Sequence, residues 1–271
     1  MAGSTDKLED YVLPSGQAGR DRLRVLARAT EPGTVRLLDE VGVTSGMACL
    51  DVGCGGGDVA RLLAERVGPT GRVVGVDLDE AVVAIAAEEA RELKVAQLVY
   101  RVGGALDLSE TAFDIAYARF LLTHLGERDQ AIGAMLETLR PGGALVLEDI
   151  DFAGHFAYPD LPELHEFCAL YAALARSTGG DAEIGRALPF LLRTAGLHDV
   201  EVRVSQPVAF TGGVKLITAR TMQGIAARLV EAGLATAGEV RRITEALDRA
   251  AADPDVLLSM PRIVQAWGVK R

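Results

Sequence analysis

The segment CLDVGCGGGDVARLL, residues 49–63, places four glycines directly after a short apolar run. Gly53, Gly55 and Gly57 can bring the backbone close to a ligand, because glycine has no side chain. The residues that follow have the apolar spacing of a helix, and a helix N-terminus favours an anionic group such as a carboxylate or phosphate. Asp77 ends the next apolar run, where a carboxylate can hold ribose hydroxyls. The spacing predicts a site for a cofactor that contains adenosine.

The acidic residues around this loop distinguish between adenosine cofactors. A dinucleotide fingerprint reads G-x-G-x-x-G, but the sixth position counted from Gly53 is Asp58. Asp51 and Asp58 flank the loop, and carboxylates disfavour a pyrophosphate while they tolerate a cationic ligand. S-adenosylmethionine (SAM) carries a ribose, a carboxylate, an ammonium and a sulfonium, so it matches this mixed demand. A nicotinamide-dependent oxidoreductase is the less favoured alternative.

Short apolar segments alternate with helical patterns over the first half of the chain. The expected strands are residues 47–53, 72–77, 97–102, 113–118 and 143–150. We expect Asp58 and Asp79 to cap helices, and a further helix to run from Asp129 to the proline at 141. Alternation of this kind predicts a Rossmann-like α/β fold: a doubly wound, mostly parallel seven-stranded sheet with helical lid insertions.

The flanking segments are interpreted as parts of one domain that spans residues 1–271. Its expected parts are an N-terminal helical cap (1–42, two short helices broken at Pro32), a cofactor-binding core (43–155), helical lid segments (156–195 and 211–255) and the last two strands (197–210 and 261–269).

Composition limits the classes of function. The net charge of −10 and the lack of a Lys/Arg run argue against a nucleic-acid partner. The three cysteines are an odd number without CxxC spacing, which indicates neither a disulfide framework nor a zinc site. No apolar stretch approaches membrane-spanning length. We therefore expect a cytoplasmic protein with no membrane partner and no metal, and the oligomeric state is left open.

Three longer motifs carry a family resemblance. LDVGCGGGDVARLLAERVGPTGRVVGVDLDE, FDIAYARFLLTHL and LRPGGALVLEDIDF resemble the class I SAM-dependent methyltransferases, especially the small-molecule enzymes of the ubiquinone/menaquinone-methyltransferase type. The resemblance covers residues 11–155, and the rest by layout only. It implies SAM as methyl donor and a small-molecule acceptor, methylated on oxygen, nitrogen or carbon. A protein of this fold that uses SAM without methyl transfer, in a cyclase-like or binding role, remains an alternative.

The resemblance also implies which residues bind the cofactor. Asp51, Gly53, Cys54 and Gly55 would surround the methionine part together with Ala118 and Arg119, Asp77 would hold the ribose, Leu78, Ala105 and Leu106 would lie near the adenine, and Tyr11 and Arg20 would cover SAM. Family members usually carry an aspartate where this chain has Gly104, and Asp107 can substitute for it.

Candidate catalytic residues follow the fourth and fifth expected strands. Asp149 and Asp151 share one side of the chain by period-two alternation, at the edge where substrate should lie. If the acceptor is a hydroxyl, His124 or His155 would remove its proton. If it is an amine, Asp149 or Asp151 would hold the ammonium and accept the proton.

Overall fold

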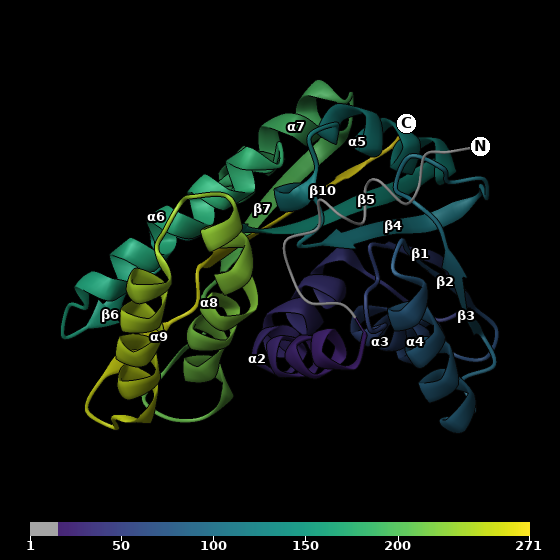
Figure 1. Cartoon of the computed structure of the whole chain (residues 1–271). Coiled ribbons are helices and arrows are strands. Elements are labelled where there is room, and N and C mark those ends of the chain that lie inside the picture. The colour runs from purple at the N-terminus through teal and green to yellow at the C-terminus, as the bar shows by residue number, and fades with distance from the viewer. Residues whose placement is uncertain (1–15) are drawn as a thin grey trace.

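A seven-stranded sheet in the order β3-β2-β1-β4-β5-β10-β7 organises the fold (Figure 1). The computed structural model describes residues 16–271, with side chains from residue 23 onward. The strands are β1 (Ala48–Val52), β2 (Arg72–Asp77), β3 (Leu98–Val102), β4 (Phe113–Arg119), β5 (Leu139–Asp151), β7 (His198–Ser205) and β10 (Arg262–Val269). The first five are parallel, and β10 runs antiparallel between β5 and β7. The predicted fold class is confirmed.

Helices cover both faces of this sheet, as its continuous apolar strands require. On one face lie α2 (Gly16–Val41), α3 (Asp58–Val67) and α4 (Glu80–Glu92), and on the other lie α5 (Arg128–Thr138) and α7 (Leu188–Thr194). Leu37, Leu38 and Leu63 pack on the first face, whereas Ile132, Met135 and Leu192 pack on the second. The two cores hold the strand ends, and therefore the loops beyond them, in fixed positions.

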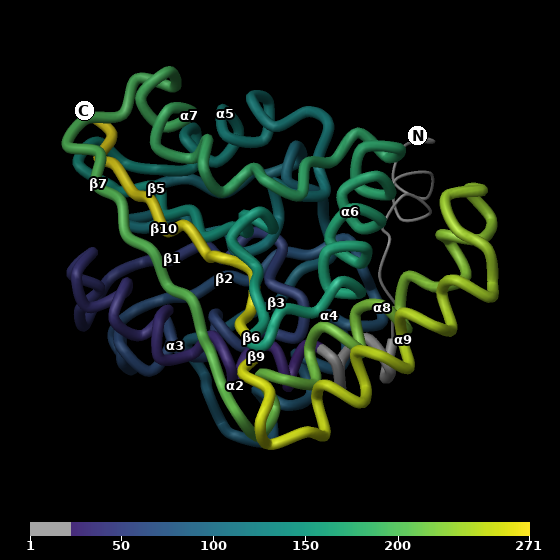
Figure 2. The backbone as a smooth tube through the Cα atoms, turned by 90° about the vertical axis from the view of Figure 1, so that its left-hand side faces the viewer, coloured from purple at the N-terminus to yellow at the C-terminus, as the bar shows by residue number. Residues whose placement is uncertain are grey.

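Three further helices, the outer helices, form a third core beyond the carboxyl end of β5. They are α6 (Pro162–Ser177), α8 (Gly213–Glu231) and α9 (Ala237–Ala252). Ile150 and Phe152 at the end of β5 pack with Phe167 of α6 and Met222 of α8. Figure 2 shows α8 and α9 lying side by side. Within the described residues, no helix combines the length and apolar character needed to span a bilayer.

Several local predictions differ from the structure. Residues 17–42 were expected as two helices, but α2 is one helix of 26 residues with Pro32 inside it. A proline inside a helix costs about 3 kcal/mol, and burial of Ala27, Leu37 and Leu38 on both sides of it offsets that cost. Asp79 caps α4 as predicted, through the Ala81 and Val82 amides. The expected cap by Asp58 is wrong, because Gly57 occupies the N-cap position.

The boundaries around β5 and the short strands also differ. Strand β5 begins at Leu139, before Pro141, because Leu139 already pairs with Phe113 of β4. Residues 184–187 form a 3-10 turn before α7. A second, three-stranded sheet, which the sequence did not indicate, joins β6 (Ala157–Tyr158), β9 (Leu257–Ser259) and β8 (Val208–Ala209).

Candidate functional site

The glycine loop, residues 53–57, joins β1 to α3 and lies against the end of β2. The backbone amides of Gly53 and Cys54 both donate to the Val76 carbonyl, at 2.8 and 3.0 Å. Gly57 has φ +72°, and a Cβ there would lie 1.9 Å from the Tyr100 hydroxyl. The Tyr100 hydroxyl also donates to the Gly57 carbonyl at 3.2 Å. The bare backbone at Gly57 therefore admits a side chain of β3.

Asp77 connects the end of β2 to this loop. Its Oδ2 accepts the Gly55 amide at 2.7 Å, and its Oδ1 accepts the Asp79 amide at 3.0 Å. Burial raises the pKa of Asp77, and the two amides oppose that shift. Because each carboxylate oxygen has two acceptor positions, Asp77 retains capacity for a ligand hydroxyl. It therefore both shapes the loop and can bind a ribose.

Asp51, near the end of β1, is a buried carboxylate with an unsatisfied oxygen. The side chain is 2 % exposed, and its Oδ2 has no hydrogen-bond partner among the described residues. Burial raises the pKa of Asp51 to about 7, although nearby Arg119 lowers it. An unsatisfied buried acceptor is costly unless a ligand completes it. A ligand ammonium beside Asp51 would supply the missing donor.

Arg119, at the end of β4, belongs to a buried polar network under helix α2. Its Nη1 donates to the hydroxyls of Thr30 and Thr34, both at 3.0 Å. The Thr34 hydroxyl donates onward to Glu148 at 3.1 Å. Glu148 also accepts from Tyr117 at 2.7 Å and is 1 % exposed. An acidic residue inside an apolar strand run was the available signal for this buried network, whereas Thr30 and Thr34 gave none.

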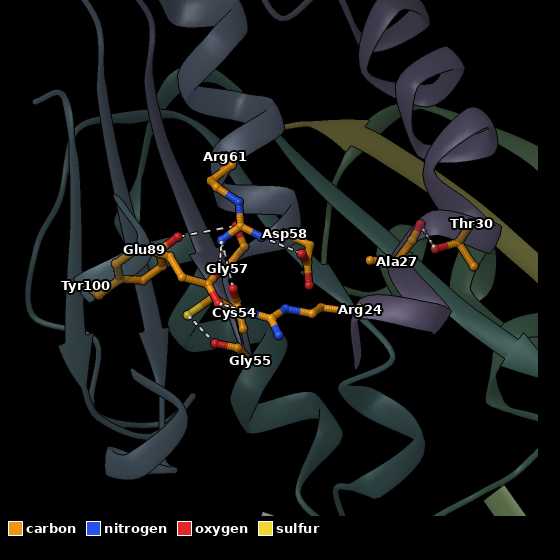
Figure 3. A network of polar contacts seen from close by, with 11 residues as sticks. Arg24, Ala27, Thr30, Cys54, Gly55, Gly57, Asp58, Arg61, Glu89 and Tyr100 are labelled. Atoms are coloured by element: carbon orange, nitrogen blue, oxygen red, sulfur yellow. Dashed lines mark hydrogen bonds and ion pairs between the residues drawn. The ribbon is translucent and has the colours of Figure 1, made fainter. Parts of the chain in front are cut away.

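A second polar cluster ties α2 to the helices beside the glycine loop (Figure 3). Arg61 of α3 donates to the Gly56 carbonyl at 2.9 Å and pairs with both Asp58 and Glu89. Arg24 of α2 pairs with Glu89 at 2.7 Å. The loop is therefore held between α2, α3 and α4.

The other residues predicted to bind the cofactor lie around the same strand ends. Leu78 follows β2, and Ala105 and Leu106 lie in the turn after β3. A Cβ on Gly104 would lie 3.2 Å from an Asp107 oxygen and 3.5 Å from Leu78, so Asp107 reaches over the position of the absent aspartate. Cys54 and Ala118 are buried, and burial raises the Cys54 thiol pKa.

The predicted cover over the cofactor falls at the edge of the described structure. Tyr11 lies outside the described residues, and Arg20 lies in α2 where the backbone alone is described. Leu23 of α2 does approach the loop, since a Cβ on Gly55 would lie 3.2 Å from it.

A pocket that is partly open to solvent adjoins this cofactor region. We call it the acceptor pocket. Phe120, Thr123 and His124, which follow Arg119 directly in the chain, form one wall. The described lining comprises Val25, Leu26, Phe120, Thr123, His124, Ile150, Phe152, His155, Phe167, Tyr171, Ile217, Thr218, Arg220, Thr221, Met260 and Pro261. The described lining is therefore assembled from the segments after β4 and around the end of β5, from α2, α6 and α8, and from the two residues before β10.

Phe120 has a special backbone conformation in this wall. Its φ is +54°, in the left-handed region that costs a non-glycine residue about 1–3 kcal/mol. The Phe120 amide donates to the Glu148 carbonyl at 2.8 Å, which holds the bend. The Arg119 guanidinium lies 5.5 Å from the centre of the Phe120 ring. This bend turns the chain from the cofactor region into the acceptor pocket, and no sequence signal indicated it.

His155 lines the pocket as a neutral imidazole with a defined tautomer. Its Nε2 lies 2.9 Å from the Ser259 carbonyl, which can only accept, so Nε2 carries the hydrogen. Nδ1 is therefore an acceptor, 3.7 Å from the Cys168 sulfur. Burial lowers the His155 pKa to about 4. His124 ends a 3-10 turn, Leu122–His124, and lines the pocket from the segment that follows β4.

Asp149 and Asp151 are not among the described lining residues. The Asp149 oxygens accept the Thr123 amide at 3.1 Å and the Ile150 amide at 2.8 Å. Burial raises the Asp149 pKa to about 7. Asp151 pairs with Arg186 at 2.5 Å and with Arg262 at 3.5 Å. Among the side chains that the structure describes, residues 23–271, no group of three or more His, Cys, Asp or Glu is arranged to hold a metal.

The chain is similar to known proteins in sequence and in fold. Residues 43–195, more than half of the chain, match the family described as "Methyltransferase domain". A demethylmenaquinone methyltransferase of Staphylococcus aureus is 31% identical over 136 residues, which are 50% of this chain and 54% of that protein. The chain thus spans about half the length of the curated relatives it matches.

Solved structures share the fold. A phosphoethanolamine N-methyltransferase 2 of Haemonchus contortus, in complex with phosphomonomethylethanolamine and S-adenosylhomocysteine, superposes with a TM-score of 0.56 at 19% identity, over 88% of this chain and 52% of that one. A methyltransferase-like protein of Bacillus halodurans gives a TM-score of 0.59 at 20% identity, over 87% of this chain and 98% of its own.

Proposed function

Because the chain belongs to the class I SAM-dependent methyltransferases, we propose that it transfers the methyl group of SAM to a small, largely apolar molecule held in the acceptor pocket. The observation that carries this proposal is the bend at Phe120. It makes residues 119–124 a wall shared between the cofactor region and an apolar pocket. The three cysteines, none of them in a disulfide, fit the reducing cytoplasm that we propose as the location.

The cofactor half of the site fits SAM by its donors and acceptors. The unsatisfied oxygen of Asp51 would accept the ammonium, and Asp77 would accept ribose hydroxyls. Leu78 and the turn after β3 would lie against the adenine, with Asp107 near its amino group. SAM supplies an activated methyl on a sulfonium. The protein contributes alignment and the exclusion of water.

The acceptor half favours a hydroxyl over an amine. No carboxylate belongs to the described lining, and both Asp149 oxygens already accept backbone amides. We therefore propose that Asp149 positions the segment that carries His124, and that Asp151 anchors Arg186 and Arg262. His124 remains the candidate to remove a hydroxyl proton. His155 is the weaker candidate, because burial lowers its pKa to about 4, its Nε2 faces the Ser259 carbonyl and its Nδ1 faces the Cys168 sulfur.

Methyl-labelled SAM tests this function. Incubation with a pool of small metabolites should yield a product heavier by one labelled methyl group, and Asp77→Ala should abolish the signal. SAM binding and acceptor consumption without any labelled product would favour the cyclase-like alternative. Heat on titration with NAD, with none for SAM, would instead support the oxidoreductase alternative.

A further inference from the structure

The acceptor pocket contains one ionic side chain in its described lining, and it is a cation. Arg220 is the sole Lys, Arg, Asp or Glu among those residues. The whole chain holds 38 acidic and 28 basic residues, so a random lining would favour an acid. An unbalanced charge at a pocket indicates the opposite charge on its ligand.

Arg220 has no acidic partner among the described residues, unlike several arginines elsewhere in the chain. Arg61, Arg91 and Arg186 each pair with an acid three positions earlier in their own segments. The positions three and four residues from Arg220 on α8 hold Leu216, Ile217, Gln223 and Gly224, none of them acidic. Its guanidinium is therefore available to an external anion.

The pocket is apolar on the side that faces the third core, between the outer helices. Phe152 and Tyr171 stack there, with ring centres 4.2 Å apart and planes 9° from parallel. Ile150, Phe167 and Met260 complete this side and are all buried. Arg220 is exposed, so it lies where the pocket meets solvent. Apolar and charged sites in one pocket orient a ligand that has both features.

We propose that the methyl acceptor is an apolar organic anion, and that Arg220 binds its carboxylate or phosphate at the pocket mouth. The apolar body then packs on Phe152 and Tyr171, and the atom to be methylated points toward the wall that carries His124. This inference rests on the proposed function and names the substrate class. A guanidinium forms two parallel hydrogen bonds to either anion, so both groups suit it.

Calorimetric titration with three naphthalene probes tests the inference. The probes are 6-hydroxy-2-naphthoate, 2-naphthyl phosphate and uncharged 2-naphthol, each added with S-adenosylhomocysteine present. The wild type should bind at least one of the two anions roughly tenfold more tightly than 2-naphthol, and the comparison of the two identifies the preferred anion. Raising the salt concentration should weaken the binding of the two anionic probes but not that of 2-naphthol.

Matched variants assign the preference to Arg220. Arg220→Gln should bind all three probes equally, Arg220→Lys should retain part of the preference, and the control Arg241→Gln, an exposed arginine of α9 outside the described lining, should behave as wild type. Equal binding of anions and 2-naphthol by the wild type, no binding of either anion, or a preference that survives Arg220→Gln would each overturn the inference. SAM binding is measured on the same samples. A wild-type protein that does not bind SAM would count against the proposed function rather than against this inference.

Discussion

Arg119 donates a 3.0 Å hydrogen bond to the Thr34 hydroxyl, which joins the end of β4 to helix α2 across 85 residues of sequence. The same hydroxyl donates to Glu148 of β5, so one small buried side chain lies between a half-buried cation and a buried anion. Such a network is costly when only partly satisfied. Helix α2 is therefore held over the cofactor region by polar contacts as well as by apolar packing.

Replacing Thr34 by valine should destabilise the fold. The change preserves the shape but removes the hydroxyl between Arg119 and Glu148, so both lose a buried partner. We expect a loss of about 1–3 kcal/mol in the free energy of unfolding, measured by urea denaturation. Thr44→Val, at an exposed threonine, is the control and should change stability by less than about 0.5 kcal/mol. Equal stability of the two variants would contradict the role of this network.

SAM affinity should rise with pH between 6 and 7.5. With its pKa raised to about 7 by burial, Asp51 is mainly protonated at pH 6 in the free protein. The ammonium of SAM favours the charged carboxylate, so binding at pH 6 must release a proton, whereas binding at pH 7.5 releases less. Affinity should fall by up to about tenfold at the lower pH.

Calorimetry in buffers of different ionisation enthalpy measures the protons released. Asp51→Asn should bind SAM more weakly at pH 7.5 and should show no pH dependence from this position. A wild-type pH dependence that persists in Asp51→Asn would assign the titration to another group.

Gly57→Ala should destabilise the protein by more than the conformational cost of a positive φ, because the added Cβ would also clash with Tyr100. Gly57 and Gly42 both have positive φ, at +72° and +82°, but only Gly57 has a neighbour that a Cβ would meet. Gly42→Ala therefore measures the conformational cost alone, about 1 kcal/mol. We expect Gly57→Ala to lose more stability than this, and SAM affinity as well. Adding Tyr100→Phe, which removes the hydroxyl nearest that Cβ, should recover part of both losses, and no recovery would contradict the steric explanation.

The sheet could be predicted from the sequence because its strands are continuous apolar runs between helical patterns. Local signals failed where tertiary contacts override them. Pro32 indicates a helix break, yet Thr34 and Leu37 beyond it have buried partners in the sheet that hold α2 as one helix. The strands at 157–158 and 208–209 have two residues each, too few for any periodicity.

The two halves of the site differ in how far they could be predicted. The proposed cofactor residues lie mostly within contiguous motifs at and after the ends of β1, β2, β3 and β4. Spacing indicated the glycine loop and Asp77, whereas the family resemblance implied the others. The acceptor pocket depends on which face of each outer helix turns inward. On α8, Met222 packs in the third core while Ile217 lines the pocket. Both residues are apolar, so the helical periodicity of the sequence does not show which face of α8 lines a pocket. For this reason the sequence did not indicate that Arg220 lines the pocket.

Asp149→Asn should slow methyl transfer without weakening SAM binding. An amide offers one oxygen where the carboxylate offers two, so either the Thr123 or the Ile150 amide loses its acceptor and faces an NH₂ group instead. The wall that carries His124 should shift, and turnover of the labelled methyl should fall roughly a hundredfold. Asp151→Asn is the comparison, because its partners Arg186 and Arg262 lie outside the described pocket lining.

Three measurements separate positioning from a purely structural role for Asp149. Its asparagine variant should keep wild-type SAM affinity by calorimetry and the wild-type pH optimum of turnover, while kcat falls more than the KM for acceptor changes, because the geometry at the methyl has changed rather than the titrating base. A shifted pH profile would mean that Asp149 itself accepts the proton. Loss of SAM binding would mean that the wall after β4 belongs to the cofactor half alone.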